Sequence, residues 1–212
     1  MDFVALDFET ANELNTSACE IGIAVVRHYK IVETKSWLIR PPQNRFNPYN
    51  TMLHGISADD VDDAMNFKEV WQELLPYFED QLLVAHNAAF DMNVMRSLLL
   101  HYEVPFKPIP YTCSIKVARK VWKDDAKRFG LSHMSKFLGI QLDHHRAESD
   151  AMACAEIASR GFREFQISFK EEIESKLNIV LGSITQQALD DTKNKFNLTI
   201  PKTPPRKRRK HW

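Results

Sequence analysis

The sequence has little of what would mark several common classes of protein. Only three cysteines occur among 212 residues, and they are widely spaced without a C-x-x-C pattern, which argues against a disulfide framework and a structural zinc site. No apolar run approaches the roughly 20 residues that a transmembrane helix needs, and MDFVALDFET lacks the basic start and apolar core of a secretory signal. We therefore expect a cytoplasmic protein with no membrane segment.

The chain also has no net charge, because 28 Lys and Arg balance 28 Asp and Glu. The balance is uneven along the chain: residues 202–212 hold six basic residues and no acid, so the first 201 residues carry 22 basic against 28 acidic residues. An acidic body repels a phosphate backbone at long range. Binding of nucleic acid would therefore need local positive charge, and a bound divalent metal would supply it.

The length predicts one domain with an appendage. Strand-like runs are Phe3–Phe8, Glu20–Arg27, Ile31–Ile39, Leu82–His86 and Ile109–Thr112. Strands come first and then alternate with helical segments, which predicts an α/β fold with one mixed, five-stranded sheet flanked by helices. We expect a domain over residues 1–166, a helical extension or linker over 167–201, and a basic, disordered tail over 202–212.

The first strand contains two acids in an apolar run, VALDFET. Side chains of a strand alternate between faces, so Asp7 and Glu9 point the same way while Val4, Leu6 and Phe8 pack on the opposite face. Two close carboxylates repel unless a cation or a proton lies between them. A metal site is one interpretation of this pair, and a solvated strand end with two incidental acids is the other.

Two later segments place acids near the start of helices. In VAHNAAFD, Asn87 is expected to cap a helix, and Asp91 follows about one turn later, where the helix dipole alone could also favour an acid. In HHRAESDAMACA, His145 precedes Asp150 by five residues, or about 140° from the same face of a regular helix. The two side chains can converge only if His145 lies in the loop before the helix.

These three segments, D-x-E at 7 and 9, N-x-x-F-D at 87–91 and H-x-A-x-x-D at 145–150, resemble the three exonuclease motifs of the DEDDh (DnaQ-like) 3′–5′ exonuclease superfamily. That superfamily includes the proofreading epsilon subunit of bacterial DNA polymerase III. The resemblance covers roughly residues 2–165, and SACEIGIAVV and LHGIS also look like family segments. It implies a ribonuclease H-like fold.

The resemblance also implies a ligand set and a mechanism. Two divalent ions, Mg²⁺ or Mn²⁺, activate water and support the leaving oxygen in such sites, and hard ions prefer carboxylate ligands. Asp7 is expected to bridge both ions, Glu9 and Asp150 to hold the water-activating ion, and Asp91 to support the second. His145 is expected to be the general base, since an unperturbed imidazole pKa near about 6.5 suits that role. His144, its neighbour, does not match the motif.

Substrate contacts follow from the same resemblance. Backbone near Phe8, Thr10 and Ala11 is expected to contact the terminal nucleotide, and Asn87 to lie close to it. His54 in LHGIS is either near the substrate groove or an ordinary turn histidine, and Phe90 is expected in the core. The chain departs from relatives that carry Asp-Thr where it has Tyr111-Thr112, at a position that is not a metal ligand in the family.

The leading hypothesis is a 3′–5′ exonuclease that degrades single-stranded DNA ends to nucleoside monophosphates, in proofreading or repair and in company with a DNA polymerase. One alternative is an RNA-trimming exoribonuclease, such as an oligoribonuclease or an RNase T-like protein, because the metal site does not select the sugar. Another class of function is a nucleic-acid- or polymerase-binding module that acts through the C-terminal region. Residues 202–212 are expected to add nonspecific phosphate affinity, and the alternatives are a nuclear-import-like address or a solvated terminus.

Overall fold

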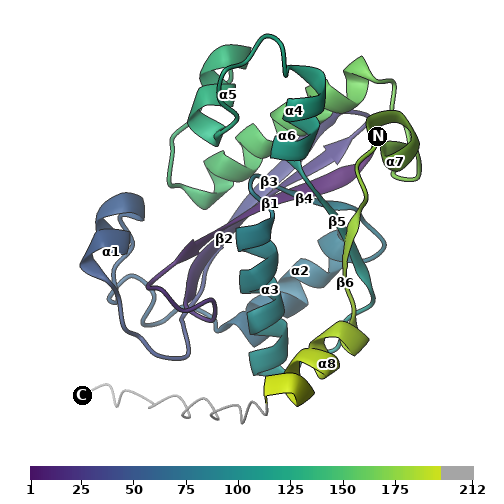
Figure 1. The fold of residues 1–212 in the computed structure, drawn as a ribbon. Helices are drawn as coiled ribbons and strands as arrows, with labels where there is room; N and C mark the ends of the chain where they lie inside the picture. The colour runs from purple at the N-terminus through teal and green to yellow at the C-terminus, as the bar shows by residue number, and fades with distance from the viewer. Residues whose placement is uncertain (197–212) are drawn as a thin grey trace, which may run out of the picture.

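The computed structural model describes residues 1–196, which form six strands and eight helices (Figure 1). The strands are β1 (Phe3–Thr10), β2 (Ala18–Arg27), β3 (Lys30–Leu38), β4 (Leu83–Ala85), β5 (Ile109–Cys113) and β6 (Gly182–Ile184). The helices are α1 (Pro48–His54), α2 (Phe67–Phe78), α3 (Ala89–Tyr102), α4 (Ser114–Val121), α5 (Leu131–Leu138), α6 (Ala147–Glu164), α7 (Glu172–Leu177) and α8 (Gln186–Phe196). The expected tail over 202–212 lies outside the described residues.

The strands form one mixed sheet in the order β3-β2-β1-β4-β5-β6. The central strand β1 pairs antiparallel with β2 and parallel with β4, β5 continues the parallel part, and β6 closes the edge antiparallel to β5. The mixed, helix-flanked sheet is confirmed. Parallel strands joined through helices bring the carboxyl ends of β1, β4 and β5 to one end of the sheet, where ligand sites form in such folds.

The expected count of five strands is wrong, because residues after 166 supply a sixth. In β6, Gly182 lies against the ring of Tyr111 on β5, and a Cβ atom at this position would be 2.1 Å from the Tyr111 Cζ atom. The glycine therefore allows the strand to lie against the ring. Three residues with a glycine give almost no alternating pattern, which is why the sequence did not reveal this strand.

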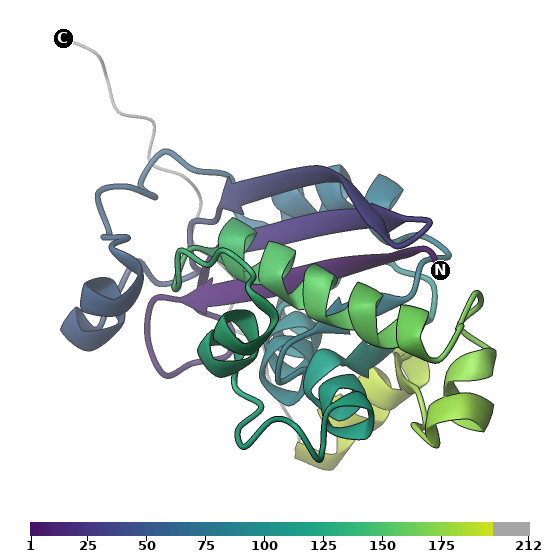
Figure 2. The same cartoon turned by 90° about the horizontal axis from the view of Figure 1, so that it is seen from above.

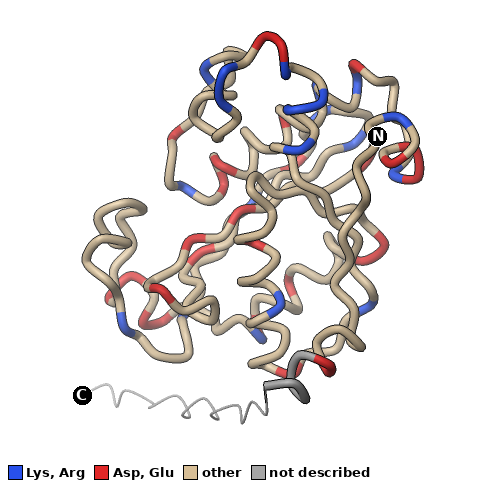
Figure 3. Tube along the Cα trace, in the orientation of Figure 1, with Lys and Arg blue, Asp and Glu red and all other residues tan. Residues whose placement is uncertain are grey.

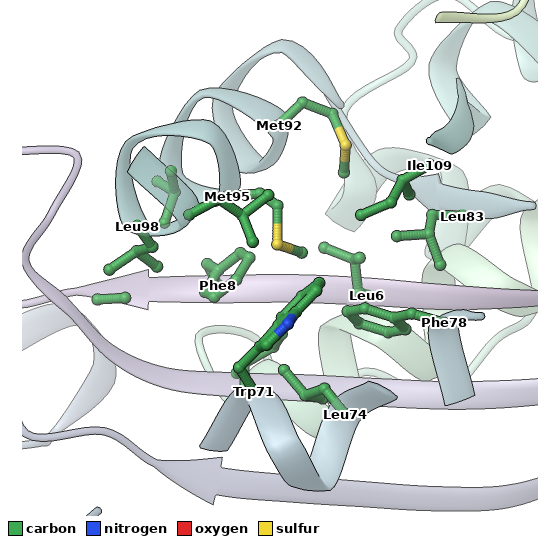
Figure 4. Packing of buried hydrophobic residues seen from close by; sticks show 14 of the residues in the cluster. Leu6, Phe8, Trp71, Leu74, Phe78, Leu83, Met92, Met95, Leu98 and Ile109 are labelled. Atoms are coloured by element: carbon green, nitrogen blue, oxygen red, sulfur yellow. The ribbon is translucent and has the colours of Figure 1, made fainter. Parts of the chain in front are cut away.

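Helices cover both faces of the sheet (Figure 2). On one face, Leu6 and Phe8 of β1 pack against side chains of α2 and α3 such as Trp71 and Met95, so the predicted apolar face of β1 is confirmed (Figure 4). On the other face, α6 packs on β1 and β2, where Phe3 meets the ring of Phe162 edge to face with ring centroids 5.7 Å apart. Asp7 and Glu9 lie on this second face, at its open end.

Several helix ends have the capping residues that are typical of such positions. Asn66 and Glu69 form the reciprocal capping box at the start of α2, and Gly139 ends α5 in the left-handed conformation with φ 65°. Asn87 does not cap: its φ is 65°, α3 begins at Ala89, and its N-cap residue Ala88 makes no side-chain capping bond. Within residues 1–196, no helix is both long enough and apolar enough to span a bilayer.

Candidate active site

The two acids of β1 meet a third acid from α6. Asp7 and Glu9 alternate with the buried Phe8, and Asp150 lies in the first turn of α6. One carboxylate oxygen from each of these three acids lies within 4.8 Å of the others. The pair of acids in VALDFET is therefore part of a carboxylate cluster and not an isolated strand end.

Asp91 is fixed against the same strand. It lies in the first turn of α3, is 1% exposed, and its Oδ1 atom accepts a hydrogen bond of 3.1 Å from the Phe8 backbone N–H. One carboxylate oxygen is thus held by the strand, and the acid lies beside the cluster. After burial itself, the charge of Asp91 makes the largest contribution to the raised pKa of Asp7.

His145 precedes α6 in the loop, as its spacing from Asp150 predicts. It adopts φ 68°, and its backbone N–H donates to the Asp150 Oδ2 atom at 3.1 Å. The ring of His145 is stacked on the ring of His144, with centroids 4.0 Å apart. Partial burial and the neighbouring His144 lower the pKa of His145, which favours the neutral imidazole that can accept a proton.

His144 is a member of this cluster that the motif does not contain. Its Nδ1 atom lies 2.9 Å from the Asp150 Oδ2 atom, whereas His145 bonds to the same oxygen through its backbone N–H. His144, His145 and Asp150 form a second group of potential metal ligands. The consecutive histidines in HHRAESD were the only sequence signal for a role of His144, because the motif H-x-A-x-x-D contains only His145.

The carboxyl groups of the site raise one another's pKa values. Burial, followed by the charges of the neighbouring acids, raises the pKa of Glu9 to about 8 and that of Asp7 well above its usual range. Burial raises the pKa of Asp91 to about 7 even though the Phe8 N–H stabilises its charged form, and burial raises that of Asp150 too. Four acids so close cannot all ionise alone, whereas divalent cations would make the four charges compatible. The donor set, all carboxylate oxygen and one imidazole pair, fits hard ions such as Mg²⁺ and Mn²⁺.

The raised pKa of Glu9 predicts how metal-free protein responds to pH. Between about pH 4.5 and about pH 8, the folded state keeps a proton that the unfolded state releases, so the free energy of unfolding falls as the pH rises. We expect the unfolding temperature in chelator to drop from pH 5 to pH 8, and Glu9→Gln to flatten this dependence. Thermal scans across that range test it, with Glu164→Gln at the far end of α6 as the control. An equally steep pH dependence in Glu9→Gln would contradict it.

Residues of β2 and β3 hold the start of α6 and were not among the predicted site residues. A Cβ atom on Gly22 would lie 2.1 Å from the Ala147 carbonyl carbon, so only glycine allows this approach of helix and strand. The Glu20 Oε2 atom accepts from the Ala147 N–H at 3.3 Å, and the Thr34 hydroxyl bonds to Glu148. A glycine inside an apolar strand is the signal that could have indicated this contact.

Some of the predicted substrate-binding residues have their polar groups bonded to the backbone of the protein. His54 is 4% exposed, its Nδ1 atom accepts from the Ile56 N–H at 3.0 Å, and its Nε2 atom lies 3.3 Å from the Thr10 carbonyl oxygen. Both ring nitrogens thus bind backbone, which favours the structural interpretation of His54. The Ala11 N–H likewise donates to the Ser17 carbonyl oxygen at 2.8 Å.

Other predicted contacts remain accessible. Asn87 is exposed at the start of α3. Phe90 is 42% exposed and not in the core, so the prediction of a core position is wrong. Asn87 lies two residues before α3, and Phe90 lies in its first turn, next to Asp91 in the sequence. Tyr111, at the departure from the family pattern, supplies no acid but accepts a hydrogen bond of 2.8 Å from Arg96 and packs on Gly182.

Comparison with known proteins agrees with this geometry. A family model described as an exonuclease matches residues 4–158. The chain is 31% identical over 184 residues to a DNA polymerase III PolC-type of Caldanaerobacter subterraneus subsp. tengcongensis, covering 85% of this chain and 13% of that protein. It is 29% identical over 167 residues to a 3′-5′ exonuclease DinG of Staphylococcus haemolyticus, covering 77% of this chain and 18% of that protein. The chain therefore spans less than a fifth of the length of these relatives.

Solved structures share the fold. Exonuclease X, determined in complex with 5′ overhanging duplex DNA, superposes with a TM-score of 0.66 at 24% identity, covering 82% of this chain and 99% of that chain. Exonuclease I of E. coli, in complex with a dT13 oligonucleotide, gives a TM-score of 0.65 at 15% identity, covering 84% and 45%. The expected ribonuclease H-like fold is confirmed by these likenesses. With three motifs gathered at one end of the sheet and a family model over most of its length, the chain belongs to the exonuclease family.

Proposed function

We propose that this chain is a metal-dependent 3′–5′ exonuclease that hydrolyses the terminal phosphodiester of single-stranded DNA and releases nucleoside monophosphates. The observation that supports it most is the convergence of Asp7, Glu9 and Asp150 within 4.8 Å, beside Asp91 and a loop histidine. Relatives named for 3′-5′ exonuclease activity carry a segment like this one within a longer protein.

The acids are the proposed ligands of two divalent ions, Mg²⁺ or Mn²⁺. Asp7 would contact both ions, Glu9 and Asp150 would hold one with it, and Asp91 would support the other. When bound, the ions would supply Lewis acidity, lowering the pKa of the attacking water and stabilising charge on the leaving 3′ oxygen. The Phe8 N–H keeps one oxygen of Asp91 on the strand and so limits the rotation of this carboxylate.

His145 is the proposed general base. Its backbone N–H is tied to Asp150, which holds the loop beside the metal ligands, and its lowered pKa keeps the imidazole neutral at pH 7. A neutral imidazole can take the proton of the attacking water. His144 is the proposed support for both groups, because its ring stacks on His145 and its Nδ1 atom contacts Asp150.

The biological setting is proposed from the relatives. Similarity to PolC-type DNA polymerase III proteins suggests a DNA polymerase as partner and a role in proofreading or repair, which would place the protein in the cytoplasm with the chromosome. Residues 1–166 would then form the catalytic unit, and residues 167–196 would complete its sheet through β6. A partner-binding role of the C-terminal region stays a prediction.

The direct test of this proposal uses labelled strands. A single-stranded DNA labelled at its 5′ end should shorten in steps, and the same strand labelled at its 3′ end should release labelled mononucleotide first. Both reactions should need Mg²⁺ or Mn²⁺ and stop with chelator. An RNA strand of the same sequence separates the DNA enzyme from an exoribonuclease. Absence of metal-dependent release from either polymer would refute the enzyme.

The exposed ring of Phe90 gives a further prediction. Phe90→Ala should raise KM for single-stranded DNA roughly 5-fold or more, because stacking of one base on an aromatic ring contributes about 1–3 kcal/mol. Steady-state kinetics on an oligonucleotide measures it. Phe169→Ala is the matched control, since Phe169 is 67% exposed beside Met1 and Tyr29. Equal KM values for wild type and Phe90→Ala would show that no base stacks there.

A further inference from the structure

The first 201 residues are acidic as a whole, but one region among them has the opposite charge. Residues 114–138, which span α4, the connecting loop and α5, carry seven Lys and Arg and two Asp, whereas the rest of the first 201 residues carries 15 basic and 26 acidic residues. The seven basic residues are Lys116, Arg119, Lys120, Lys123, Lys127, Arg128 and Lys136. In Figure 3 they gather over α4 and α5, above the acids at the end of the sheet.

The basic residues of α4 lie on one face of the helix. Lys116, Arg119 and Lys120 are spaced three and four residues apart on one exposed face of α4, and Lys123 follows in the turn after the helix, while Val117 and Ala118 are buried on the other side. All four basic residues are exposed. We call them the α4 basic stripe.

The charges of this stripe are largely uncompensated. Among residues 1–196, no carboxylate lies within 4.0 Å of Lys116, Arg119 or Lys120, and Lys123 has only the exposed Asp124 at 4.0 Å. The Arg119 guanidinium lies over the ring of Phe129, 5.8 Å from its centroid, which orders the side chain without neutralising it. Several unpaired cations on one helix face suit a polyanion better than a single acidic side chain.

A groove lies between two residues of this stripe and the residues that precede α3. Its volume is about 510 Å³, and its lining includes Lys116 and Arg119 of α4, Asn87 and Ala88 before α3, and Tyr111 of β5. Asn87 and Ala88 immediately precede α3, whose first turn carries Asp91. The ends of β4 and β5 are paired in register, which explains why the starts of α3 and α4 are neighbours.

We propose that this groove and the α4 basic stripe bind the backbone phosphates of the single-stranded DNA that leads away from the 3′-terminal nucleotide. The proposal rests on the proposed exonuclease function, because it takes the end of the strand to lie at the acid cluster. It supplies what metal ions at the cleavage site cannot, namely attraction for the phosphates upstream of that site on an otherwise acidic surface. The partly exposed Tyr111 and the exposed Val180, both in the groove lining, offer apolar contact to the bases of the same segment.

The test compares two variants with the same change in charge. Lys116→Gln/Lys120→Gln removes two charges from the stripe, and Lys30→Gln/Lys170→Gln removes two at the opposite end of the sheet, near the β2–β3 turn. Steady-state kinetics use a 20-nucleotide single-stranded DNA and a dinucleotide between 50 and 200 mM salt. Unchanged unfolding temperatures verify that each variant is folded.

We expect the stripe variant to raise KM for the 20-nucleotide strand about 5- to 10-fold at 50 mM salt, with kcat and dinucleotide cleavage unchanged. The slope of log affinity against log salt should become shallower by about 0.7 for each phosphate that the variant no longer neutralises. The control variant should match the wild type. An unchanged KM, an equal rise in KM for the dinucleotide, or an equal effect in the control variant would overturn the proposal.

A binding measurement keeps this proposal separate from the exonuclease itself. Fluorescence anisotropy of a labelled 20-nucleotide DNA with Asp7→Asn protein in chelator reports the groove without any cleavage. Weaker binding after the two stripe substitutions supports the groove even if no nuclease activity is found. If an acidic peptide binds this face and the DNA does not, the groove is a protein-docking surface and the proposal fails.

Discussion

Asp7→Asn is expected to lower kcat by at least about 10³-fold while the protein remains folded. Asp7 lies under the influence of every other acid of the site: its pKa is raised by burial and then by Asp91, Asp150, Glu9 and Glu20 in turn. An amide keeps the shape of the side chain and removes the charge that would hold both divalent ions. The chemistry should fail because the ligand set is incomplete, and not because the strand is damaged.

The same substitution should have the opposite effect on metal-free stability. A partly buried carboxylate among other acids destabilises the folded state above its unfolded pKa, so replacing it with asparagine should raise the unfolding temperature in chelator at pH 8. Addition of Mg²⁺ or Mn²⁺ should raise the unfolding temperature of the wild type, because an ion that binds only the folded state stabilises it. In Asp7→Asn this response should be small or absent.

Three measurements on one pair of proteins therefore test the metal site. They are kcat on single-stranded DNA, the unfolding temperature in chelator, and its change on adding metal. Glu164→Gln, an exposed charge change at the far end of α6, should behave as the wild type in all three. A variant that retains activity, or one that unfolds well below the wild type in chelator, would return Asp7 to a structural role.

The site acids could be predicted from the sequence because each one is fixed by a short local pattern. Alternation along β1 places Asp7 and Glu9 on one face. Asp91 lies in the first turn of α3, shortly after β4 ends, and Asp150 lies in the first turn of α6, shortly after the loop that carries His145. The order of the motifs then brings the three segments to one end of the sheet. The spacing of His145 from Asp150 also required a loop, and the structure has one.

What the sequence did not predict depends on contacts between distant segments. The strand at Gly182 pairs with Tyr111, 71 residues earlier, and glycine is needed there because a Cβ atom would clash with the Tyr111 ring. The burial of His54 follows from two backbone partners, at Thr10 and Ile56, and no pattern in LHGIS specifies them. Asparagine is a favoured N-cap residue, but Asn87 has a left-handed backbone conformation and does not occupy the N-cap position.

Gly22→Ala is expected to reduce both stability and activity by disturbing the contact between β2 and the start of α6. The added Cβ atom would lie 2.1 to 2.3 Å from backbone atoms of Ala147 and Glu148, and backbone cannot move aside as a flexible side chain can. Overpacking of this kind costs about 1–3 kcal/mol or more, which lowers the unfolding temperature of a chain of this size by roughly 2–12 °C. Thermal unfolding measures that change directly.

Activity should fall further than stability alone explains. The first turn of α6 carries Asp150, and the loop before it carries His145, so a helix pushed off β2 moves both away from Asp7. A displacement of about 1 Å in a reacting group can cost about 10²-fold in rate. We therefore expect kcat at 20 °C, where the variant is still folded, to fall by about 10-fold to 100-fold.

Gly130→Ala is the matched control for this variant. Gly130 has extended backbone, with φ −67° and ψ 154°, and no atom lies within 4 Å of a Cβ atom built there. The same substitution should leave the unfolding temperature and kcat close to those of the wild type. If Gly22→Ala lowers the unfolding temperature but leaves kcat unchanged at 20 °C, the helix accommodates the methyl group without moving Asp150, and Gly22 serves stability alone.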